Sequence, residues 1–359
     1  MEYINKNRKL GLSGLMRVMN DAQTLAASID SCVEALNELI ITYNDCTDDS
    51  PQIIEQKRQQ YPNKIIVVPY PYHVMGINLS DEEYEYVKTL PEDSPHLLAS
   101  YYNNALKHVN YKYVVKIDAD QIYFTEKLAK LRNDIVNGVR QTKLGHIIGK
   151  LVGLAFAQSM GSKKLWSQWH PRHYMQYVLV PLFKKQYYKY AISELVKGNV
   201  YIALSGVNAL KIDNTWYSPM GCQTGYGLWD PYNGEEDTLV FEASNDTYYV
   251  PWDLITYKSN NGSHAYIERF EYPNKTKLNI GLIWFHLKPM QKDSYPQFVN
   301  YYKEHRHEMI KLSSIENLSY KQILSFGYAN EHRKYYYNFV HNYDRKNIKK
   351  QLFVLEQFK

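Results

Sequence analysis

Residues 111–123, with the sequence YKYVVKIDADQIY, combine a run of β-branched and aromatic residues with two aspartates. Tyr113 to Ile117 has the pattern of a strand that is buried on both faces, as in a parallel sheet. Asp118 and Asp120 follow one residue apart, so their side chains leave an extended backbone on the same face. Two carboxylates directed at one volume favour a divalent cation completed by substrate phosphates. A solvated Asp-rich turn is the alternative, and the upstream sequence decides between the two.

Strands and helices alternate at short spacing before this stretch. The predicted strands are 10–19, 39–43 and 64–68, and the predicted helices are 20–36, 52–61 and 94–108. Asn20 and Asp21 are suited to cap the first helix. This βαβ pattern predicts an α/β fold with a mostly parallel sheet flanked by helices, and ligands in such sheets bind outside the carboxyl ends of the strands.

Polar clusters occur where ligands are expected, at strand ends and on the helix that enters the central strand. They are Arg17-x-x-Asn20-Asp21, Asn44-Asp45, Tyr102-Asn103-Asn104 and Asp118-x-Asp120. Together they resemble the nucleotide-sugar half of GT-A fold glycosyltransferases, in particular the inverting glycosyltransferase family 2. The sequences of these motifs are most similar to those of the bacterial lipooligosaccharide β-1,4-N-acetylgalactosaminyltransferases, and the resemblance covers about residues 10 to 130.

The resemblance implies roles for these residues. Asp45 would hydrogen-bond the uracil or ribose of a UDP-sugar, and Asp120 and Asp118 would hold Mn²⁺ or Mg²⁺ with the ribose-diphosphate. The remaining donor-binding candidates are Arg17, Asn20, Tyr102 and Asn103. The family usually has Asp-Asp-Gly-Ser after the second strand, whereas this chain has Asn44-Asp45-Cys46-Thr47. Asp45 is therefore the base-reading candidate.

The second half of the chain contains candidates for the acceptor site. A glycine-rich loop, residues 221–234, leads into Glu235, Glu236 and Asp237, which are expected to open a helix. Acidic residues there can simply complement the helix dipole. The resemblance instead implies that Asp237 is the general base with Glu236 beside it, and Asp230 and Glu235 remain alternatives.

His286 ends an apolar stretch, residues 278–288, that is predicted to form a strand. A single histidine in this position is more often structural and held by a hydrogen bond. The resemblance to GT-A enzymes instead implies that His286 is a metal ligand in addition to Asp118 and Asp120. Both interpretations stay open at the level of the sequence.

The segment from Arg140 to Lys197 has ten basic residues against the single acidic residue Glu194, a net charge of +9. Its aromatic residues include Trp166, Trp169, Tyr187 and Tyr188, and its apolar stretch is too short to span a bilayer. One interpretation is an insertion with an aromatic core and a solvated lysine face. The other is a patch for an anionic membrane surface or glycan, contacted by Lys163, Lys164, Lys184 and Lys185. Nucleic acid is not expected as a partner.

Four segments follow from these patterns: a nucleotide-sugar half (1–139), the basic aromatic-rich helical insertion (140–198), an acceptor-binding half (199–298) and a basic helical extension (299–359). The three cysteines have no motif spacing, and the first residues contain no apolar signal segment, so a cytoplasmic protein at the inner face of the membrane is expected. We expect a UDP-sugar as donor (GalNAc, GlcNAc or Gal), and a lipid-linked or other bacterial surface glycan, such as lipooligosaccharide, lipopolysaccharide or capsule, as acceptor. A non-catalytic glycan- or membrane-binding protein and a sugar-nucleotide pyrophosphorylase are the alternatives.

Overall fold

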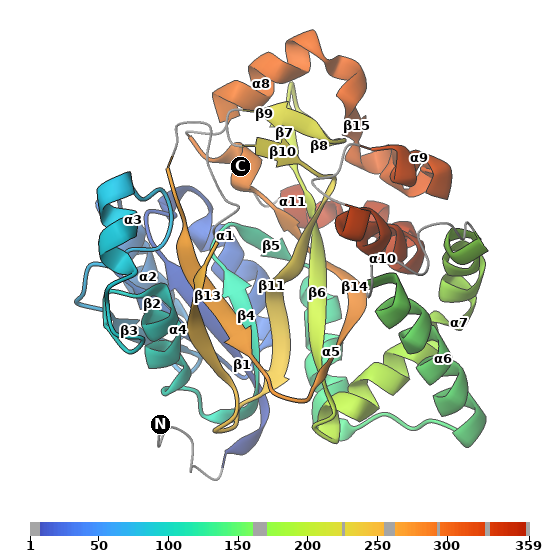
Figure 1. The fold of residues 1–359 in the computed structure, drawn as a ribbon, viewed down its shortest axis with the longest axis horizontal. Helices are drawn as coiled ribbons and strands as arrows, with labels where there is room; N and C mark the ends of the chain where they lie inside the picture. The colour runs from blue at the N-terminus through green and yellow to red at the C-terminus, as the bar shows by residue number, and fades with distance from the viewer. Residues whose placement is uncertain are drawn as a thin grey trace. The chain divides into compact units, whose positions relative to one another are not determined.

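The computed structural model describes residues 8–160, 171–224, 227–254, 263–292, 295–326 and 331–356. Its helices and strands are labelled in Figure 1. The chain divides into two compact units. The first unit comprises Met1–Asp120, Gly225–Gly227 and Phe241–Asn274. The second comprises Gln121–Thr224, Leu228–Val240 and Lys275–Lys359.

Four parallel strands form the core of the first unit, in the order β3-β2-β1-β4. They are β1 (Lys9–Val18), β2 (Glu38–Tyr43), β3 (Ile65–Pro69) and β4 (Tyr111–Asp118). The connecting helices are α1 (Ala22–Cys32), α2 (Ser50–Gln60), α3 (Asp81–Val87) and α4 (Leu98–Leu106). Tyr113 to Ile117 is buried throughout, as the apolar run predicted. The predicted α/β class with a mostly parallel sheet is confirmed.

An antiparallel hairpin completes the first unit. Its strands are β12 (Tyr248–Asp253) and β13 (Tyr266–Glu271), and both pack against α4. The sequence analysis did not identify this hairpin.

The start of α1 differs in detail from the predicted cap. Asp21 is the N-cap residue, but its carboxylate accepts from Met19 N and not from the helix. Asp48 takes over this function, because its Oδ2 accepts from Ala22 N at 2.9 Å. The loop after β2 therefore caps the helix after β1, which joins two loops at the same edge of the sheet.

The second unit contains four strands in the order β11-β6-β14-β5. They are β5 (Gln121–Tyr123), β6 (Val200–Asn208), β11 (Tyr232–Glu242) and β14 (Thr276–His286). β6 and β14 are parallel, and β11 and β5 run antiparallel to their neighbours. The helix predicted to begin at Glu235 is wrong, because these residues belong to β11, which is held by its pairing with β6.

Helices surround these strands in the insertion and in the C-terminal extension, and the predicted helical character of both is confirmed in the described residues. The insertion contains α6 (Lys143–Met160) and α7 (Pro171–Val196), and the extension contains α9 (Tyr320–Ser325), α10 (Glu331–Gln351) and α11 (Phe353–Glu356). α5 (Thr125–Asn137) precedes the insertion, and α8 (Tyr295–Glu304) leads into the extension. Short 3₁₀ turns are Val33–Ala35, Lys288–Met290, Arg306–Glu308 and Leu312–Asn317, and two short strands are β9 (Cys222–Thr224) and β10 (Gly227–Trp229).

A buried carboxylate joins three of these helices. Asp344 on α10 is 1% exposed and forms ion pairs with Lys127 on α5 and with Lys184 on α7, the latter at 2.5 Å. Its Oδ2 also accepts from Leu282 N on β14 at 3.0 Å. Lys184 is therefore engaged inside the protein, which contradicts its expected role as a membrane-facing lysine. Lys163 and Lys164 lie outside the described residues.

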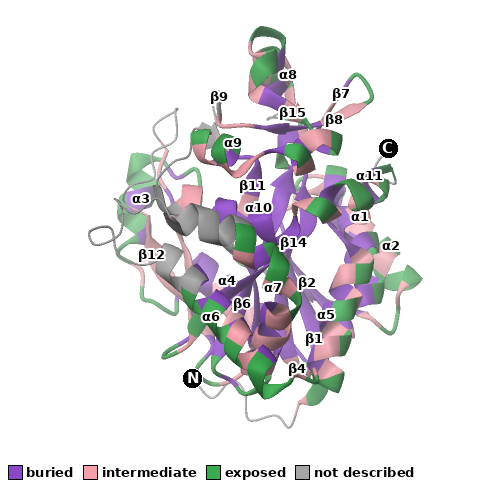
Figure 2. Cartoon of the chain, turned by 90° about the vertical axis from the view of Figure 1, so that its right-hand side faces the viewer, coloured by how far each residue is buried: buried purple, intermediate pink, exposed green. Residues whose placement is uncertain are grey.

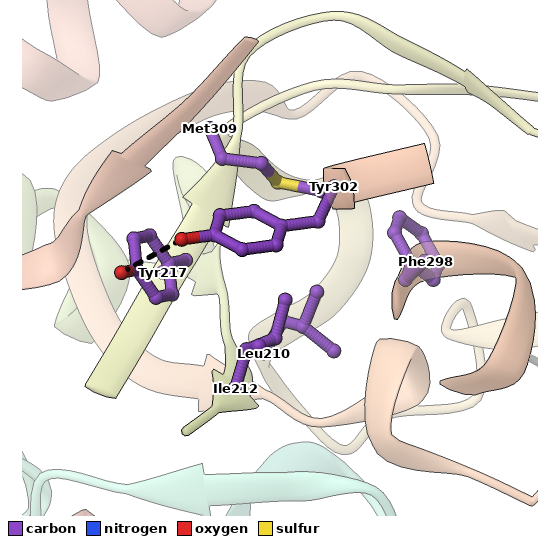
Figure 3. Packing of buried hydrophobic residues seen from close by; sticks show 6 residues of the cluster. All are labelled: Leu210, Ile212, Tyr217, Phe298, Tyr302 and Met309. Carbon is purple, nitrogen blue, oxygen red and sulfur yellow. Dashed lines mark hydrogen bonds between the residues drawn. The ribbon is translucent and has the colours of Figure 1, made fainter. Parts of the chain in front are cut away.

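A separate small sheet has its own apolar core (Figure 3). Strands β7 (Leu210–Ile212), β8 (Thr215–Pro219) and β15 (Met309–Lys311) form the sheet, and α8 packs against it. Tyr302 donates to the hydroxyl oxygen of Tyr217 at 3.0 Å, so the two phenols satisfy each other inside the cluster. The buried residues are Leu210, Ile212, Tyr217, Phe298, Tyr302 and Met309.

Candidate active site

The end of β4 places a lysine and an aspartate together. Lys116 Nζ lies 3.3 Å from Asp118 Oδ1, with 11% and 24% of the two side chains exposed. Ser28 Oγ on α1 donates to the carbonyl oxygen of Asp118 at 3.0 Å, which fixes the strand end. Asp120 lies in the turn that follows. The two predicted aspartates thus stand at the carboxyl end of a parallel strand, beside Lys116, to which the sequence analysis assigned no role.

Arg17 supplies a second positive charge from the end of the neighbouring strand β1. Its Nε donates to the Tyr102 hydroxyl oxygen at 3.3 Å, and its guanidinium carbon lies 5.9 Å from the centre of the Tyr102 ring. Lys116 Nζ lies 5.4 Å from the same ring centre. Burial works against the charge of Arg17, but Tyr102 and Glu268 outweigh it and raise the pKa of Arg17. Two basic side chains therefore converge on one tyrosine.

Glu268, on β13, faces these charges. Burial raises the pKa of its carboxyl group, although Lys116 and Arg17 act in the opposite direction. The resulting group contains two basic and two acidic side chains, so an anionic ligand such as a diphosphate would need additional positive charge beside Arg17 and Lys116. We call it the charged cluster, with the members Arg17, Tyr102, Lys116, Asp118, Tyr249 and Glu268.

Tyr249, on β12, is the member whose hydrogen bonding is incomplete. Its ring stacks on Tyr102 with 4.8 Å between ring centres, and 3% of the residue is exposed. Its hydroxyl has no hydrogen-bond partner within the described part of the chain. Burial raises the pKa of this hydroxyl well above its ordinary value, and the charges of Lys116, Glu268 and Asp118 act on it. A buried hydroxyl without a partner beside charged groups is suited to bind a ligand oxygen.

Asp45 lies at the carboxyl end of β2 in a left-handed backbone conformation, with φ of 46°. Its Oδ2 accepts from Asn44 Nδ2 at 2.9 Å and from Val74 N at 3.3 Å, and lies 2.8 Å from His73 Nδ1. The Asp45 side chain remains 38% exposed. It therefore has a defined orientation and is still accessible to a ligand.

Asn20 has a structural function that the sequence did not indicate. Its Oδ1 accepts from Thr47 N at 2.7 Å and from Asp48 N at 3.3 Å. The amide oxygen therefore organises the loop that contains Asp45, and Asn20 is placed to position that loop.

Asn103 is likewise occupied within the protein. Its Nδ2 donates to Tyr249 O and its Oδ1 accepts from Tyr249 N, each at 2.8 Å. The predicted donor-binding asparagine thus joins α4 to β12, while the preceding residue, Tyr102, belongs to the charged cluster.

The carboxylates of the first unit fit a divalent cation in part. No three His, Cys, Asp or Glu side chains among the described residues form a group that could hold a metal ion. Mg²⁺ and Mn²⁺ sites in phosphate-transfer chemistry are commonly built from one or two carboxylates with substrate phosphates. Asp118 and Asp120 supply such oxygens, and the balanced charges of the cluster leave room for an added cation to attract a diphosphate.

His286, in the second unit, ends β14 as predicted. It is 9% exposed, and its Nδ1 lies 2.7 Å from Asn208 Oδ1. The Trp229 ring stacks against it at 6.2 Å between centres. When Nδ1 donates to the amide oxygen, Nε2 carries the lone pair, which is the arrangement of a histidine oriented for metal binding. The same hydrogen bond equally suits a structural histidine.

The acidic candidates of the second half lie on or beside β11. Asp230 is buried, and its Oδ2 lies 3.5 Å from Arg333 Nη1. Its carbonyl oxygen accepts from Asn208 Nδ2 at 2.6 Å, so Asp230 and His286 share one asparagine as a partner. The backbone of Glu235, Glu236 and Asp237 is extended, and their side chains lie outside what the structure describes.

Sequence reasoning missed three members of the charged cluster: Lys116, Tyr249 and Glu268. Lys116 carried a usable signal, because a lysine inside an otherwise apolar buried strand requires a partner. Tyr249 and Glu268 had no local signal, since only the packing of the hairpin on α4 brings them to the strand ends.

Comparison with known protein families gives a match to the first part of the chain. Residues 5–135 match the model of a family described as β-1,4-N-acetylgalactosaminyltransferase (CgtA). A search among curated proteins found no match. The matched segment contains β1 to β4 and the residues Arg17, Asp45, Tyr102, Asp118 and Asp120.

Solved structures with detectable similarity include two bacterial proteins. S. aureus TarS in complex with UDP-GlcNAc is 13% identical, with 97% of this chain and 80% of that chain covered and a TM-score of 0.33. Glucosyl-3-phosphoglycerate synthase from Mycobacterium tuberculosis, in complex with Mn²⁺, UDP and glucosyl-3-phosphoglycerate, is 17% identical, with 43% of this chain and 52% of that chain covered and a TM-score of 0.23. The ligands belong to those proteins. Over residues 5–135, this chain has the sequence pattern of the β-1,4-N-acetylgalactosaminyltransferase family, and the resemblance predicted from its motifs is confirmed there.

Proposed function

We propose that the protein is an inverting, metal-dependent glycosyltransferase that transfers a sugar from a UDP-sugar to a bacterial surface glycan. The charged cluster at the ends of β1 and β4 is the observation that supports this most directly. Four of its members, Arg17, Tyr102, Lys116 and Asp118, lie in the segment that matches a glycosyltransferase family. The cluster combines basic side chains, carboxylates and the hydroxyl of Tyr249, which has no partner among the described residues.

The donor would be held from two sides in this proposal. Arg17 and Lys116 would bind the diphosphate oxygens, and Asp45 would accept a hydrogen bond from the uracil or ribose. Asn20 would act indirectly, by holding the loop of Asp45. The Tyr249 hydroxyl would donate to an oxygen of the donor, which would complete its hydrogen bonding.

Departure of UDP leaves negative charge on the diphosphate. A divalent cation held by Asp120 and Asp118 would supply positive charge there. His286, in the second unit, separately keeps the hydrogen-bonded arrangement of a histidine oriented for metal binding. Arg17 and Lys116 would stabilise the same charge through direct hydrogen bonds. The acceptor hydroxyl must lose a proton as it attacks the anomeric carbon, and Asp237 is the proposed base, with Glu236, Glu235 and Asp230 as alternatives.

UDP release from a panel of UDP-sugars, with a glycan acceptor and with water alone, tests this proposal. We expect release with Mn²⁺ or Mg²⁺, loss of release in EDTA, and recovery when metal is restored. Asp120→Ala should be inactive but folded, and the exposed Asp246→Ala is the matched control. Turnover that persists in EDTA would contradict the metal assignment. A folded protein that binds sugars but never releases UDP would favour a non-catalytic binding protein.

We further propose a peripheral contact with an anionic membrane. None of the helices in the described ranges combines the length and the hydropathy that a bilayer-spanning segment requires. Helix α6 nevertheless carries four exposed apolar side chains at helical spacing, with 48% to 67% of each residue exposed: Leu144, Ile147, Leu151 and Leu154. Such a stripe on one helix face is typical of a surface that lies on a membrane or against a partner.

The opposite face of α6 is packed. Gly149 and Gly153 are buried against α7, and a Cβ on Gly149 would lie 2.5 Å from Tyr190 Cβ, so the glycine allows the close approach of the two helices. Figure 2 shows α6 and α7 coloured by burial. Lys143 and Lys150 are exposed next to the apolar stripe, each four residues before one of its members. Basic residues beside an exposed apolar stripe favour an anionic lipid surface over a neutral one. Tyr187, by contrast, is fully buried and belongs to the core.

A further inference from the structure

A pocket of about 460 Å³ lies in the first unit, apart from most of the charged cluster. Its walls come from α4, which contributes Asn103 among others, from the start of β12, and from residues 70–72 after β3 and 92–95 before α4. Arg17, Tyr102, Lys116, Asp118 and Glu268 are not among its lining residues, and Tyr249 is the one cluster member that contributes to it. Pockets of this size accommodate small ligands or single sugar rings.

Tyrosines supply the apolar part of the wall. Tyr70 and Tyr72 lie 5.3 Å apart between ring centres at an interplanar angle of 65°, and Tyr248 faces the pocket from β12. Tyr70 is fixed, because its hydroxyl donates to Pro95 O at 2.8 Å. Tyr72 is 45% exposed, which is high for a large aromatic residue and leaves its ring accessible to a ligand.

Polar side chains form the rest of the pocket wall. Ser100 and Asn104 on α4 and its C-cap residue Lys107 follow one another at the spacing that brings side chains to the same side of a helix. The side chains of Ser100 and Asn104 make no hydrogen bond with any described residue. Glu92 and Asp93 add two exposed carboxylates against the one ammonium of Lys107.

This lining selects a class of ligand. Aromatic faces at an angle suit the C–H faces of a pyranose, and amide, hydroxyl and carboxylate groups suit its equatorial hydroxyls. The excess of carboxylates disfavours phosphorylated or acidic sugars. We propose that this pocket binds a neutral or N-acetylated pyranose of a glycan, separately from the nucleotide site. Such binding does not depend on catalysis. It would allow the protein to bind a glycan at a sugar residue distant from the hydroxyl that reacts.

Saturation-transfer NMR tests the proposal, with the full-length protein in EDTA and without UDP. The probes are the methyl β-glycosides of glucose, galactose, N-acetylglucosamine and N-acetylgalactosamine. We expect transfer to at least one glycoside, and binding weaker by about fivefold or more in Tyr72→Ala and Tyr248→Ala, because each loses a ring face. Tyr86→Ala is the matched control, since Tyr86 is 56% exposed and does not line the pocket.

The outcomes separate this site from the donor site. Binding that UDP with Mn²⁺ leaves unchanged supports a separate site, whereas competition by UDP would overturn it. Absence of transfer to all four glycosides, or equal binding by Tyr72→Ala, Tyr248→Ala and the parent, would also overturn it. UDP release from UDP-sugars, measured on the same variants, reports on the proposed transferase independently, and we expect it to persist in Tyr72→Ala.

Discussion

Asn103 holds the backbone of Tyr249 through both atoms of its amide, each at 2.8 Å. One side chain thereby replaces a strand neighbour: it satisfies the N–H and the C=O of a residue on β12. Tyr249 in turn stacks on Tyr102. The asparagine therefore acts on the charged cluster indirectly, by fixing the strand that carries one of its members.

Replacing Asn103 by alanine should reduce stability. Two buried backbone groups of Tyr249 would lose their partners, which costs about 2 kcal/mol in the free energy of unfolding. Denaturant unfolding measures this loss, and Asn137→Ala, an exposed position on α5, is the control. If Asn103→Ala kept full stability while the donor KM rose, Asn103 would contact the donor directly.

Asp45 tests donor recognition. We expect Asp45→Ala to raise the donor KM by about tenfold or more, because a buried hydrogen bond to the base or ribose loses its acceptor. Stability should change by about 1 kcal/mol at most, since the contact with His73 is exposed. His73→Ala is the informative comparison: an equal rise in KM there would show that Asp45 acts through the loop and not through the donor.

Asp344 is predicted to stabilise the second unit through its two ion pairs. Asp344→Asn would leave Lys127 and Lys184 without a buried counter-charge, at a cost of about 3 kcal/mol or more. The loss should appear as a lower midpoint in denaturant unfolding. The exposed Asp246→Asn should leave the midpoint unchanged.

The same carboxylate predicts a pH dependence. Burial acts against its charge, but Lys127 and Lys184 outweigh burial and hold the pKa of Asp344 below its ordinary value. A depressed pKa in the folded state means that the contribution is complete above the unfolded value, about 4, and is lost as pH falls through the folded value. Between pH 5 and pH 2 the parent should therefore lose more stability than Asp344→Asn. Parallel curves for the two proteins would contradict this assignment.

The α6 stripe predicts membrane behaviour. The protein should bind vesicles containing phosphatidylglycerol at low salt and should be released at high salt. Lys143→Glu with Lys150→Glu should weaken binding by about 30-fold or more, at about 1 kcal/mol for each lost basic residue. Ile147→Ser with Leu151→Ser should weaken it at all salt concentrations, whereas the exposed Ile77→Ser should not. Unchanged vesicle binding together with a smaller oligomer in the serine variant would assign the stripe to self-association.

The first unit was largely predictable because its signals are local. A strand buried on both faces, such as Tyr113 to Ile117, reads as a continuous apolar run, and the polar residues after it can only lie at the strand end. Asp45 and Asp118 were located in this way.

The second half was less predictable because tertiary pairing decides its structure. Glu235, Glu236 and Asp237 have the composition of a first helical turn, yet pairing of Leu239 with Ala203 draws the segment into a strand. Glu268 was missed for a related reason. Its neighbours Lys116 and Arg17 are remote in sequence. No local sequence pattern predicts that the β12–β13 hairpin packs against α4.

The pairing of β14 with β6 determines which insertions and deletions β14 can tolerate. Asn279 pairs with Ala203 but Leu282 pairs with Ser205, and Trp284 then pairs with Gly206, so β14 holds two residues more than β6 over this interval. Gly281, at φ of 92°, lies in the first irregularity, and Gly206 lies opposite the second, where a Cβ would lie 2.0 Å from Trp284 Nε1. In each irregularity the extra residue is left unpaired and the residues after it return to register, so that His286 pairs with Asn208. Deletion of either extra residue therefore removes one irregularity and leaves His286 beside Asn208, whereas deletion of Phe285, after the second irregularity, would shift the register by one residue and turn the histidine to the other face of the sheet.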